Sequence, residues 1–474
     1  MKEYSHHDAV SLAQLVRRRE VSAAELLDAA LKRVAEVNPA INAVVSQFTE
    51  QARAALADGL PQGPLSGVPF LLKDLYALCT GMITTNGCRF LTGNVADHDT
   101  EMVARYKRAG LLIFGKTNTP EFGLTVSTEP RLFGATRNPW KLDYMAGGSS
   151  GGAAAAVAAG VIPAAHASDG GGSIRIPASC CGLFGLKPTR GRNPVGPDRG
   201  EGWAGMSSEH VITRSVRDSA AFLDVTQGPD KGAPYFATLP VRPYLDELER
   251  APGRLRVGLA TRTPAGETVH PECERAAREA AQLLSGFGHD VEEFTLSGVG
   301  ADFGAAFRVI IGGNIRAAVD MYAARLGREP GPDDLENITR VSYVAGGKAS
   351  AADLARAIIV HHATGRRIAA WFDRYDVVLT PTLAEPPWKL GIFDMMSTDA
   401  EAYGRNVARF TAFTAPFNCS GNPAMTLPLH WSVDGLPIGV QIAGRYGDEA
   451  TLFRLAGQIE QARPWVDRRP ALQA

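Results

Sequence analysis

Cysteine is scarce in this sequence. The 474 residues include only six cysteines, scattered along the chain with no C-x-x-C pair, and no H-E-x-x-H motif is present. A disulfide scaffold requires more cysteines at closer spacing, and a zinc site requires clustered Cys or His ligands. We therefore expect no disulfide framework and no metal centre, and we expect the thiols to be small core residues.

The net charge is close to zero, and long apolar runs are absent. The formal net charge is −1 at pH 7 and no basic run occurs, so the chain has no field that would gather nucleic acid or an acidic membrane surface. No stretch reaches the roughly 18 apolar residues of a membrane span. The N-terminus, MKEYSHHDAVSLAQLVRRRE, lacks the order of a signal peptide. We expect a globular cytoplasmic protein that binds neither nucleic acid nor membrane.

Lysine is rare, and the common phosphate-binding motifs are absent. The chain has ten lysines against 39 arginines. It contains no G-x-x-x-x-G-K-[ST], no G-x-G-x-x-G after a predicted strand and no S-x-x-K. These absences argue against a nucleotide-binding protein and against a serine enzyme of the penicillin-binding type.

Glycine and serine, in contrast, gather in two clusters, GGSSGG at residues 147–152 and DGGGS at residues 169–173. Between them, residues 153–160 are small enough to form a tightly packed helix, and residues 161–167 are typical of a buried strand. A flexible linker would not have this organisation. Both clusters lie at the ends of elements, where glycines let backbone N–H groups approach a ligand. A serine beside such amides has the parts of a nucleophile with an oxyanion hole.

Three segments resemble the amidase signature family, whose members are serine hydrolases with a Ser–cis-Ser–Lys triad. They are GGSSGG, the run DGGGSIRIPASCCGLFGLKPTRGR, which contains the second cluster, and GVPFLLKD at residues 67–74. The resemblance implies that Ser173 is the nucleophile, Ser149 the bridging serine and Lys73 the base. Further segments that resemble the family lie at residues 37–43, 115–122, 134–139, 213–218, 417–421 and 439–442.

The resemblance also implies the fold and the reaction. The implied fold is α/β, a mixed central β-sheet covered on both faces by helices, and the implied activity is hydrolysis of carboxamide C–N bonds without a cofactor. Within the family, ASDGGGSIRIPAS and the ending GVQI…PWVDRRP resemble amidases of the nylon-oligomer (6-aminohexanoate cyclic dimer) hydrolase type more than the amidotransferase subunit that works on charged tRNA. We therefore expect a small or oligomeric, apolar amide as substrate.

The implied base requires a special environment. A free lysine has a pKa of about 10.4 and is a poor base at neutral pH, so Lys73 must be desolvated. The apolar run at residues 65–72 leads directly into it and predicts that its side chain enters the interior. Ser149 can then pass a proton from Ser173 to Lys73, which makes Ser173 Oγ the attacking atom of an acyl-enzyme mechanism.

The residues around the predicted nucleophile have predicted roles of their own. The backbone N–H groups of Gly170, Gly171, Gly172 and Ser173 are the candidate oxyanion hole. The family more often carries a larger residue at position 170. We expect Asp169 and Arg175 to pair and hold the turn, and Ser150 to be a hydrogen-bonding neighbour of the triad. The apolar candidates for a substrate pocket, each equally compatible with a core position, are Tyr76, Phe122, Met145, Ile174, Trp203 and Trp388.

Strand and helix patterns alternate along the chain, as in an α/β fold. A capping box at Ser22 begins a helix over residues 26–37 that Asn38 and Pro39 are expected to end. Other strand patterns lie at residues 254–260, 290–294, 375–380 and 438–442, with a helix pattern at residues 271–288. We expect a single amidase signature domain over residues 1–474, with a catalytic core at about 60–230 and 370–474 and a variable cap at 298–347.

Several alternatives stay open at this point. The same triad would serve a urethanase, an esterase, an aryl acylamidase or a glutaminase-type amidotransferase subunit. Residues 147–151 satisfy G-x-S-x-G, and ten histidines allow a Ser–His–Asp enzyme, although residues 138–146 make a poor strand before the serine. His361 and His362 are expected to be an exposed helix pair. A non-enzymatic interaction protein would leave the Gly/Ser clusters without a role, and a homodimer is compatible with the sequence.

Overall fold

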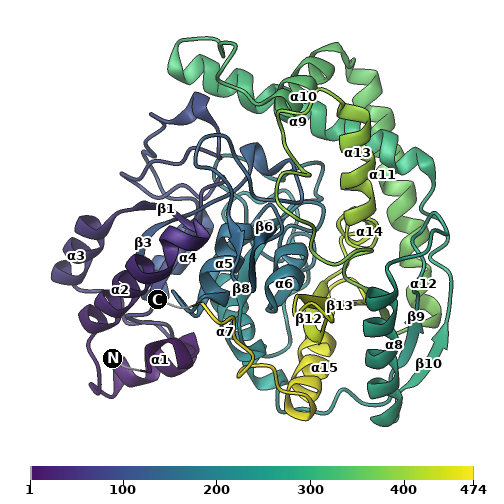
Figure 1. Ribbon diagram of the computed structural model, residues 1–474, viewed down its shortest axis with the longest axis horizontal. Coiled ribbons are helices and arrows are strands. Elements are labelled where there is room, and N and C mark those ends of the chain that lie inside the picture. The colour runs from purple at the N-terminus through teal and green to yellow at the C-terminus, as the bar shows by residue number, and fades with distance from the viewer. Residues whose placement is uncertain (1–2, 473–474) are drawn as a thin grey trace.

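The computed structural model describes residues 3–472 and contains one central sheet of eleven strands (Figure 1). The strand order is β1-β3-β2-β6-β8-β7-β12-β13-β11-β9-β10, and β4 and β5 form a separate ribbon. The strands are β1 Val44–Gln47, β2 Pro69–Lys73, β3 Leu112–Thr117, β4 Arg137–Asn138, β5 Lys141–Met145, β6 Ala164–Asp169, β7 Phe184–Lys187, β8 Ser208–Thr213, β9 Arg256–Leu259, β10 Asp290–Glu293, β11 Val377–Pro381, β12 Ala424–Trp431 and β13 Pro437–Gly444.

Helices flank this sheet, so the expected α/β architecture is confirmed. Helices α5 and α6 pack against β6 and β7, α7 and α15 against β8 and β13, and α8 against β11 and β13. The helices are α1 Ala9–Arg17, α2 Ala23–Ile41, α3 Thr49–Asp58, α4 Glu101–Arg108, α5 Gly151–Ala158, α6 Arg175–Cys181, α7 Val216–Thr226, α8 Pro271–Gly286, α9 Ala301–Leu326, α10 Asn337–Lys348, α11 Ala351–Ala369, α12 Trp371–Arg374, α13 Ala400–Phe410, α14 Ala415–Ser420 and α15 Glu449–Ala462. Short 3-10 turns lie at Tyr4–His6, Arg89–Leu91, Glu121–Gly123 and Leu245–Glu247.

The pairing of β2 with β6 sets the position of the site. These strands are parallel, with Leu71 opposite Ala165, so their carboxyl ends meet at one edge of the sheet. All residues of both strands are buried, as expected for strands covered on both faces. Ligands of α/β sheets bind beyond the carboxyl ends of the strands. Lys73 ends β2 and Asp169 ends β6, so the two segments singled out in the sequence converge there.

Two boundaries differ from the sequence-based expectation. Helix α2 does not end at Pro39 but continues to Ile41, because the missing proline N–H removes one hydrogen bond near the helix end while fully buried Ile41 anchors the last turn. Asn42 then ends the helix at φ 49°. Strand β6 begins at Ala164 rather than at residue 161, because Pro163 has no N–H to donate to the sheet.

The segment at residues 298–347 is helical. It forms α9 and α10, which pack on each other, and α11 packs against α9 and α14 (Figure 1). Within residues 3–472, no helix has both the length and the apolar composition needed to cross a membrane.

Candidate active site

Lys73 and Ser149 are in direct contact. The Lys73 side chain is fully buried, and its Nζ lies 2.7 Å from Ser149 Oγ and 3.0 Å from Ser168 Oγ. The apolar sequence of β2, PFLLK, brings the amine inside because the preceding residues are buried on both faces of the sheet. The structure thus joins two of the three residues implied by the family resemblance.

Burial changes the chemistry of the Lys73 amine. Desolvation lowers its pKa to about 7, and the carboxylates of Asp169 and Glu209 oppose this shift. A substantial fraction of the amine is therefore neutral near pH 7, as a proton acceptor must be.

The loop that carries Ser149 is held closely by its neighbours. The Gly148–Ser149 peptide bond is cis. A Cβ at Gly148 would lie 2.7 Å from the backbone nitrogen of Ser127, so only glycine fits there. Ser150 lies at the N-cap of α5, and its Oγ donates to the carbonyl oxygen of Ser168 at 3.2 Å. Ser150 thereby ties this loop to the end of β6.

The turn that carries Ser173 is fixed by a buried ion pair. Arg175 donates to Asp169 from Nε at 3.0 Å and from Nη2 at 2.9 Å, and both side chains are fully buried. Asp169 also accepts the backbone N–H of Ile174 at 3.1 Å. Burial opposes ionisation of Asp169, but the Arg175 guanidinium holds its pKa at about 2. The carboxylate therefore stays charged and holds both ends of the glycine run.

Residues from the C-terminal part of the chain complete this turn. Arg175 donates to Gln441 Oε1 at 2.7 Å and to Asn418 Oδ1 at 2.6 Å. Asn418 Nδ2 donates to Asp169 Oδ1 at 2.8 Å and to the Met206 carbonyl at 3.0 Å. The sequence analysis identifies the segments that contain Asn418 and Gln441 but gives these residues no role, since no local pattern connects them with Arg175.

Ser173 lies at the accessible end of the turn. It is partly exposed, follows Gly172, whose φ of 140° favours glycine, and precedes α6. Its hydroxyl makes no side-chain hydrogen bond to another residue within 3–472. Ser173 is thus accessible to a substrate, whereas Lys73 and Ser149 are buried.

The backbone amides of the glycine run are also free. The N–H groups of residues 170–173 donate to no acceptor in the described chain, although the next amides, those of Ile174 and Arg175, both donate to Asp169. Backbone amides in protein interiors are normally paired. Four successive free amides before a partly exposed serine are what an oxyanion hole requires.

Trp203 occupies the space beside Gly170. A Cβ at Gly170 would lie 2.7 Å from Cε3 and Cζ3 of the indole. The ring also meets Phe307 of α9 edge to face, with the centroids 6.4 Å apart. A Cβ at Gly171 would lie 3.5 Å from Phe307 Cζ. The indole of Trp203 thus fills the space that a larger side chain at position 170 would need.

We expect Gly170→Ala to lower kcat/KM about tenfold, because overpacking of this kind costs about 1–3 kcal/mol. Gly170 does not have a positive φ, so the conflict arises from the Trp203 ring alone. The double variant Gly170→Ala/Trp203→Ala should recover part of the loss, since it frees the space for the methyl group. Steady-state kinetics on an anilide substrate measure both effects. A double variant that is no better than the sum of the single changes would contradict this coupling.

The other pocket candidates lie in different surroundings. Tyr76 is stacked under the Arg199 guanidinium, 4.2 Å from the ring centroid, and shares an apolar cluster with buried Phe122. Met145 and Ile174 are core residues in the structure, because both are fully buried in the main apolar cluster. Trp388 packs on the same cluster and stacks on Phe393. Of the six candidates, Trp203 lies against Gly170 and Ile174 directly follows Ser173, but the Ile174 side chain is fully buried in the core.

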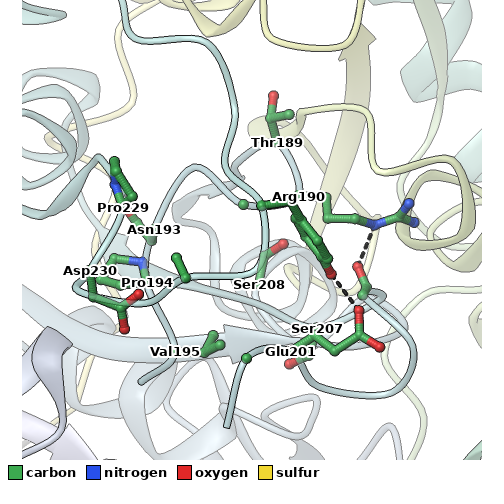
Figure 2. A pocket seen from close by; sticks show the side chains of 15 residues that line it. Thr189, Arg190, Asn193, Pro194, Val195, Glu201, Ser207, Ser208, Pro229 and Asp230 are labelled. Atoms are coloured by element: carbon green, nitrogen blue, oxygen red, sulfur yellow. Dashed lines mark hydrogen bonds between the residues drawn. The ribbon is translucent and has the colours of Figure 1, made fainter. Parts of the chain in front are cut away.

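A separate polar cavity is lined by residues of the loops around Arg190 and Asp230 (Figure 2). Its volume is only about 30 Å³, and the residues that line it come from two segments, 189–208 and 229–235. Arg190 lies at one side of it and donates from Nε to the Gly205 carbonyl at 2.6 Å. None of Lys73, Ser149 and Ser173 lines this cavity, so it is distinct from the candidate active site.

The nearest histidine does not provide a Ser–His pair. His166 Nδ1 accepts the backbone N–H of Lys73 at 3.3 Å, and its Nε2 faces Glu209 Oε2 at 3.3 Å. Both ring nitrogens are thus engaged away from the serines. His361, expected to be exposed, is instead buried, because α11 packs against α14 on that face.

Comparisons with known proteins show the family of this chain. A family model described as Amidase matches residues 25–453. The chain is 42% identical to 6-aminohexanoate-cyclic-dimer hydrolase of Pseudomonas sp. (strain NK87), over 98% of this chain and 96% of that protein. A solved structure of 6-aminohexanoate cyclic dimer hydrolase has a TM-score of 0.94 at 39% identity and covers 98% of this chain and 99% of that one. A bacterial aryl acylamidase structure has a TM-score of 0.89 at 27% identity, over 99% of both chains. The chain therefore belongs to the amidase signature family and is a hydrolase of amide bonds.

Proposed function

We propose that this enzyme hydrolyses apolar amides, small or oligomeric, through an acyl-enzyme on Ser173 with Ser149 and Lys73 as the proton path. The observation that carries the proposal is the 2.7 Å contact between the buried Lys73 amine and Ser149 Oγ, together with the free amides of residues 170–173. A buried neutral amine in contact with a serine is an activating base.

The proposed reaction begins with proton transfer. Neutral Lys73 takes the proton of Ser149 as Ser149 takes that of Ser173, and Ser173 Oγ attacks the amide carbon. The developing oxyanion is stabilised by the free N–H groups of the glycine run. The C–N bond then breaks, and the proton returns through Ser149 to the leaving amine. Water repeats the sequence on the ester, which releases the carboxylic acid and restores Ser173.

The substrate class is supported by the walls of the site. Trp203 and Phe307 place two aromatic rings beside the glycine run, which favours an apolar acyl group over a charged one. Two of the similar proteins are named for such substrates, 6-aminohexanoate cyclic dimer hydrolase and a bacterial aryl acylamidase, whereas others are named as a glutamyl-tRNA(Gln) amidotransferase subunit and a peptide amidase. An aryl acylamidase, a urethanase or an esterase would use the same proposed chemistry.

The domain organisation and the cellular compartment of the enzyme can be proposed as well. We propose one amidase domain in which α9 and α10 form a cap, because Phe307 of α9 reaches the glycine run from outside the sheet. We also propose a cytoplasmic location, because all six cysteines are buried free thiols, as is usual in a reducing compartment.

A substrate panel tests the proposed substrate class. The panel contains 6-aminohexanoate cyclic dimer, a chromogenic anilide, a carbamate, an ester of the same acyl group and glutamine, each compared by kcat/KM. We expect the apolar amides to be cleaved and glutamine to be the poorest substrate. Glutamine as the preferred substrate would indicate an amidotransferase-type glutaminase, and Ser173→Ala serves as the blank for every compound.

A further inference from the structure

The ring of His166 lies between the proposed base and a buried carboxylate. His166 is fully buried, and its Nδ1 accepts the backbone N–H of Lys73 at 3.3 Å. Because a backbone amide can only donate, the ring proton belongs on Nε2, which then donates to Glu209 Oε2 at 3.3 Å. Glu209 therefore fixes the tautomer and the orientation of the ring that holds the Lys73 backbone.

Glu209 connects this ring with the outer surface of the molecule. Its second oxygen lies 3.4 Å from Arg199 Nη2, and Arg199 is stacked on Tyr76. Arg199 begins the loop that also carries Trp203, and the side chain of Asn193 holds the Glu209 carbonyl at 2.7 Å. A continuous set of contacts thus runs from this loop through Glu209 and His166 to Lys73.

Few other charges act on the Lys73 amine. From β6 it faces His166, Ser168 and Asp169, and from β8 it faces Glu209. Burial lowers the pKa of His166, so the ring is neutral at physiological pH. Burial opposes ionisation of Glu209, but His166 and Arg199 keep its pKa below the usual value. Lys116, the buried lysine on β3, acts on His166 rather than on Lys73.

The two carboxylates near Lys73 differ in how far they are compensated. Asp169 is neutralised by two hydrogen bonds from fully buried Arg175. Glu209 has a single longer contact, 3.4 Å, with Arg199, whose side chain is 30% exposed. Because water screens the exposed guanidinium, more of the Glu209 charge remains to act inside the protein.

We propose that Glu209, acting through His166, is a positioning residue that orients Lys73 and supplies a buried negative charge near it. The inference rests on the proposed function, because it assumes that Lys73 is the proton acceptor. A base that is too weak cannot take the proton of Ser149, even when it is neutral.

The test is the pH dependence of Ser173 labelling by a fluorophosphonate, followed by peptide mass spectrometry, together with the pH profile of kcat/KM. Both profiles are expected to rise with pH as Lys73 loses its proton, and we call this rise the acid limb. In Glu209→Gln we expect the acid limb to move to lower pH by about one unit, because a carboxylate that raised the Lys73 pKa is gone. The plateau rate should fall several-fold while KM stays nearly constant. Glu209→Asp keeps the charge and should keep the acid limb of the wild type.

Variants of His166 provide an independent test if Glu209→Gln does not fold. His166→Gln retains one acceptor for the Lys73 N–H and one donor for Glu209, and should keep most of the plateau rate. His166→Leu has neither and should lower kcat with little change in KM. Equal rates for these two variants, or an unchanged acid limb in folded Glu209→Gln, would overturn the inference.

The outcomes separate this inference from the proposed function. If wild-type labelling occurs on Ser173 and depends on Lys73, but the Glu209 and His166 variants match the wild type, only the inference is wrong. If labelling of Ser173 does not depend on Lys73, both are wrong.

Discussion

Replacing Ser173 with alanine is expected to lower kcat by about four to six orders of magnitude, as removal of a nucleophile does in other serine hydrolases. Ser173 is partly exposed and its hydroxyl has no side-chain partner among residues 3–472, so the change should leave the fold intact. A fluorophosphonate should modify the wild-type enzyme stoichiometrically on Ser173 and should not modify Ser173→Ala. Mass spectrometry of the intact protein and of its peptides measures the adduct, and thermal unfolding measures the stability.

Ser149→Ala is the matched comparison for this experiment. The nucleophile remains in this variant and only its proton path is broken, so labelling should become slower but should still occur on Ser173. Stoichiometric modification of Ser149 or Ser150 in the wild type, with Ser173 unmodified, would show that the roles of the two serine clusters are reversed.

Lys73→Met is expected to lower kcat/KM by about two to four orders of magnitude at neutral pH, the usual contribution of a general base. Methionine has a similar length and no charge, so it suits the buried position. The amine must be neutral to act, and its pKa is about 7, so wild-type kcat/KM should rise with pH through about 7 and then level off. The variant should lose this limb and regain part of its activity at high pH, where hydroxide replaces the base. A pH–rate profile measures both effects.

Lys187 offers a matched control for assigning the rise of kcat/KM with pH to Lys73. It is also fully buried, and burial lowers its pKa to about 7, but its amine donates to the Pro188 carbonyl and contacts no serine. We expect Lys187→Met to keep the wild-type acid limb. A limb that disappears in Lys187→Met and persists in Lys73→Met would mean that the wrong lysine has been assigned as the base.

The features that could be predicted from the sequence are those that a short segment determines. The apolar run before Lys73 predicts its burial, and the capping box at Ser22 begins α2 as expected. The two Gly/Ser clusters lie at element ends because helix α5 and strand β6 separate them. The contact between Lys73 and Ser149 follows from the family resemblance and not from spacing, since 76 residues separate them.

Long-range contacts could not be predicted in this way. Asn418 and Gln441 reach Arg175 across 243 and 266 residues, and no periodicity in a single sequence encodes such a pair. Glu209 and His166 were missed because a buried carboxylate and an imidazole inside strand patterns are also compatible with ordinary core positions. Pro39 was misjudged because helix burial outweighed local propensity.

Two of the side chains that bind Arg175, Asn418 and Gln441, are added late in synthesis of the chain. All three proposed catalytic residues, Lys73, Ser149 and Ser173, leave the ribosome long before Asn418 and Gln441, and β12 inserts next to β7 only when it has been made. Until then Arg175 has Asp169 alone among the side chains that bind it, and the turn of Ser173 lacks its C-terminal support. We expect a nascent chain to remain without amidase activity until its last strands are released, so hydrolysis begins only with the finished protein.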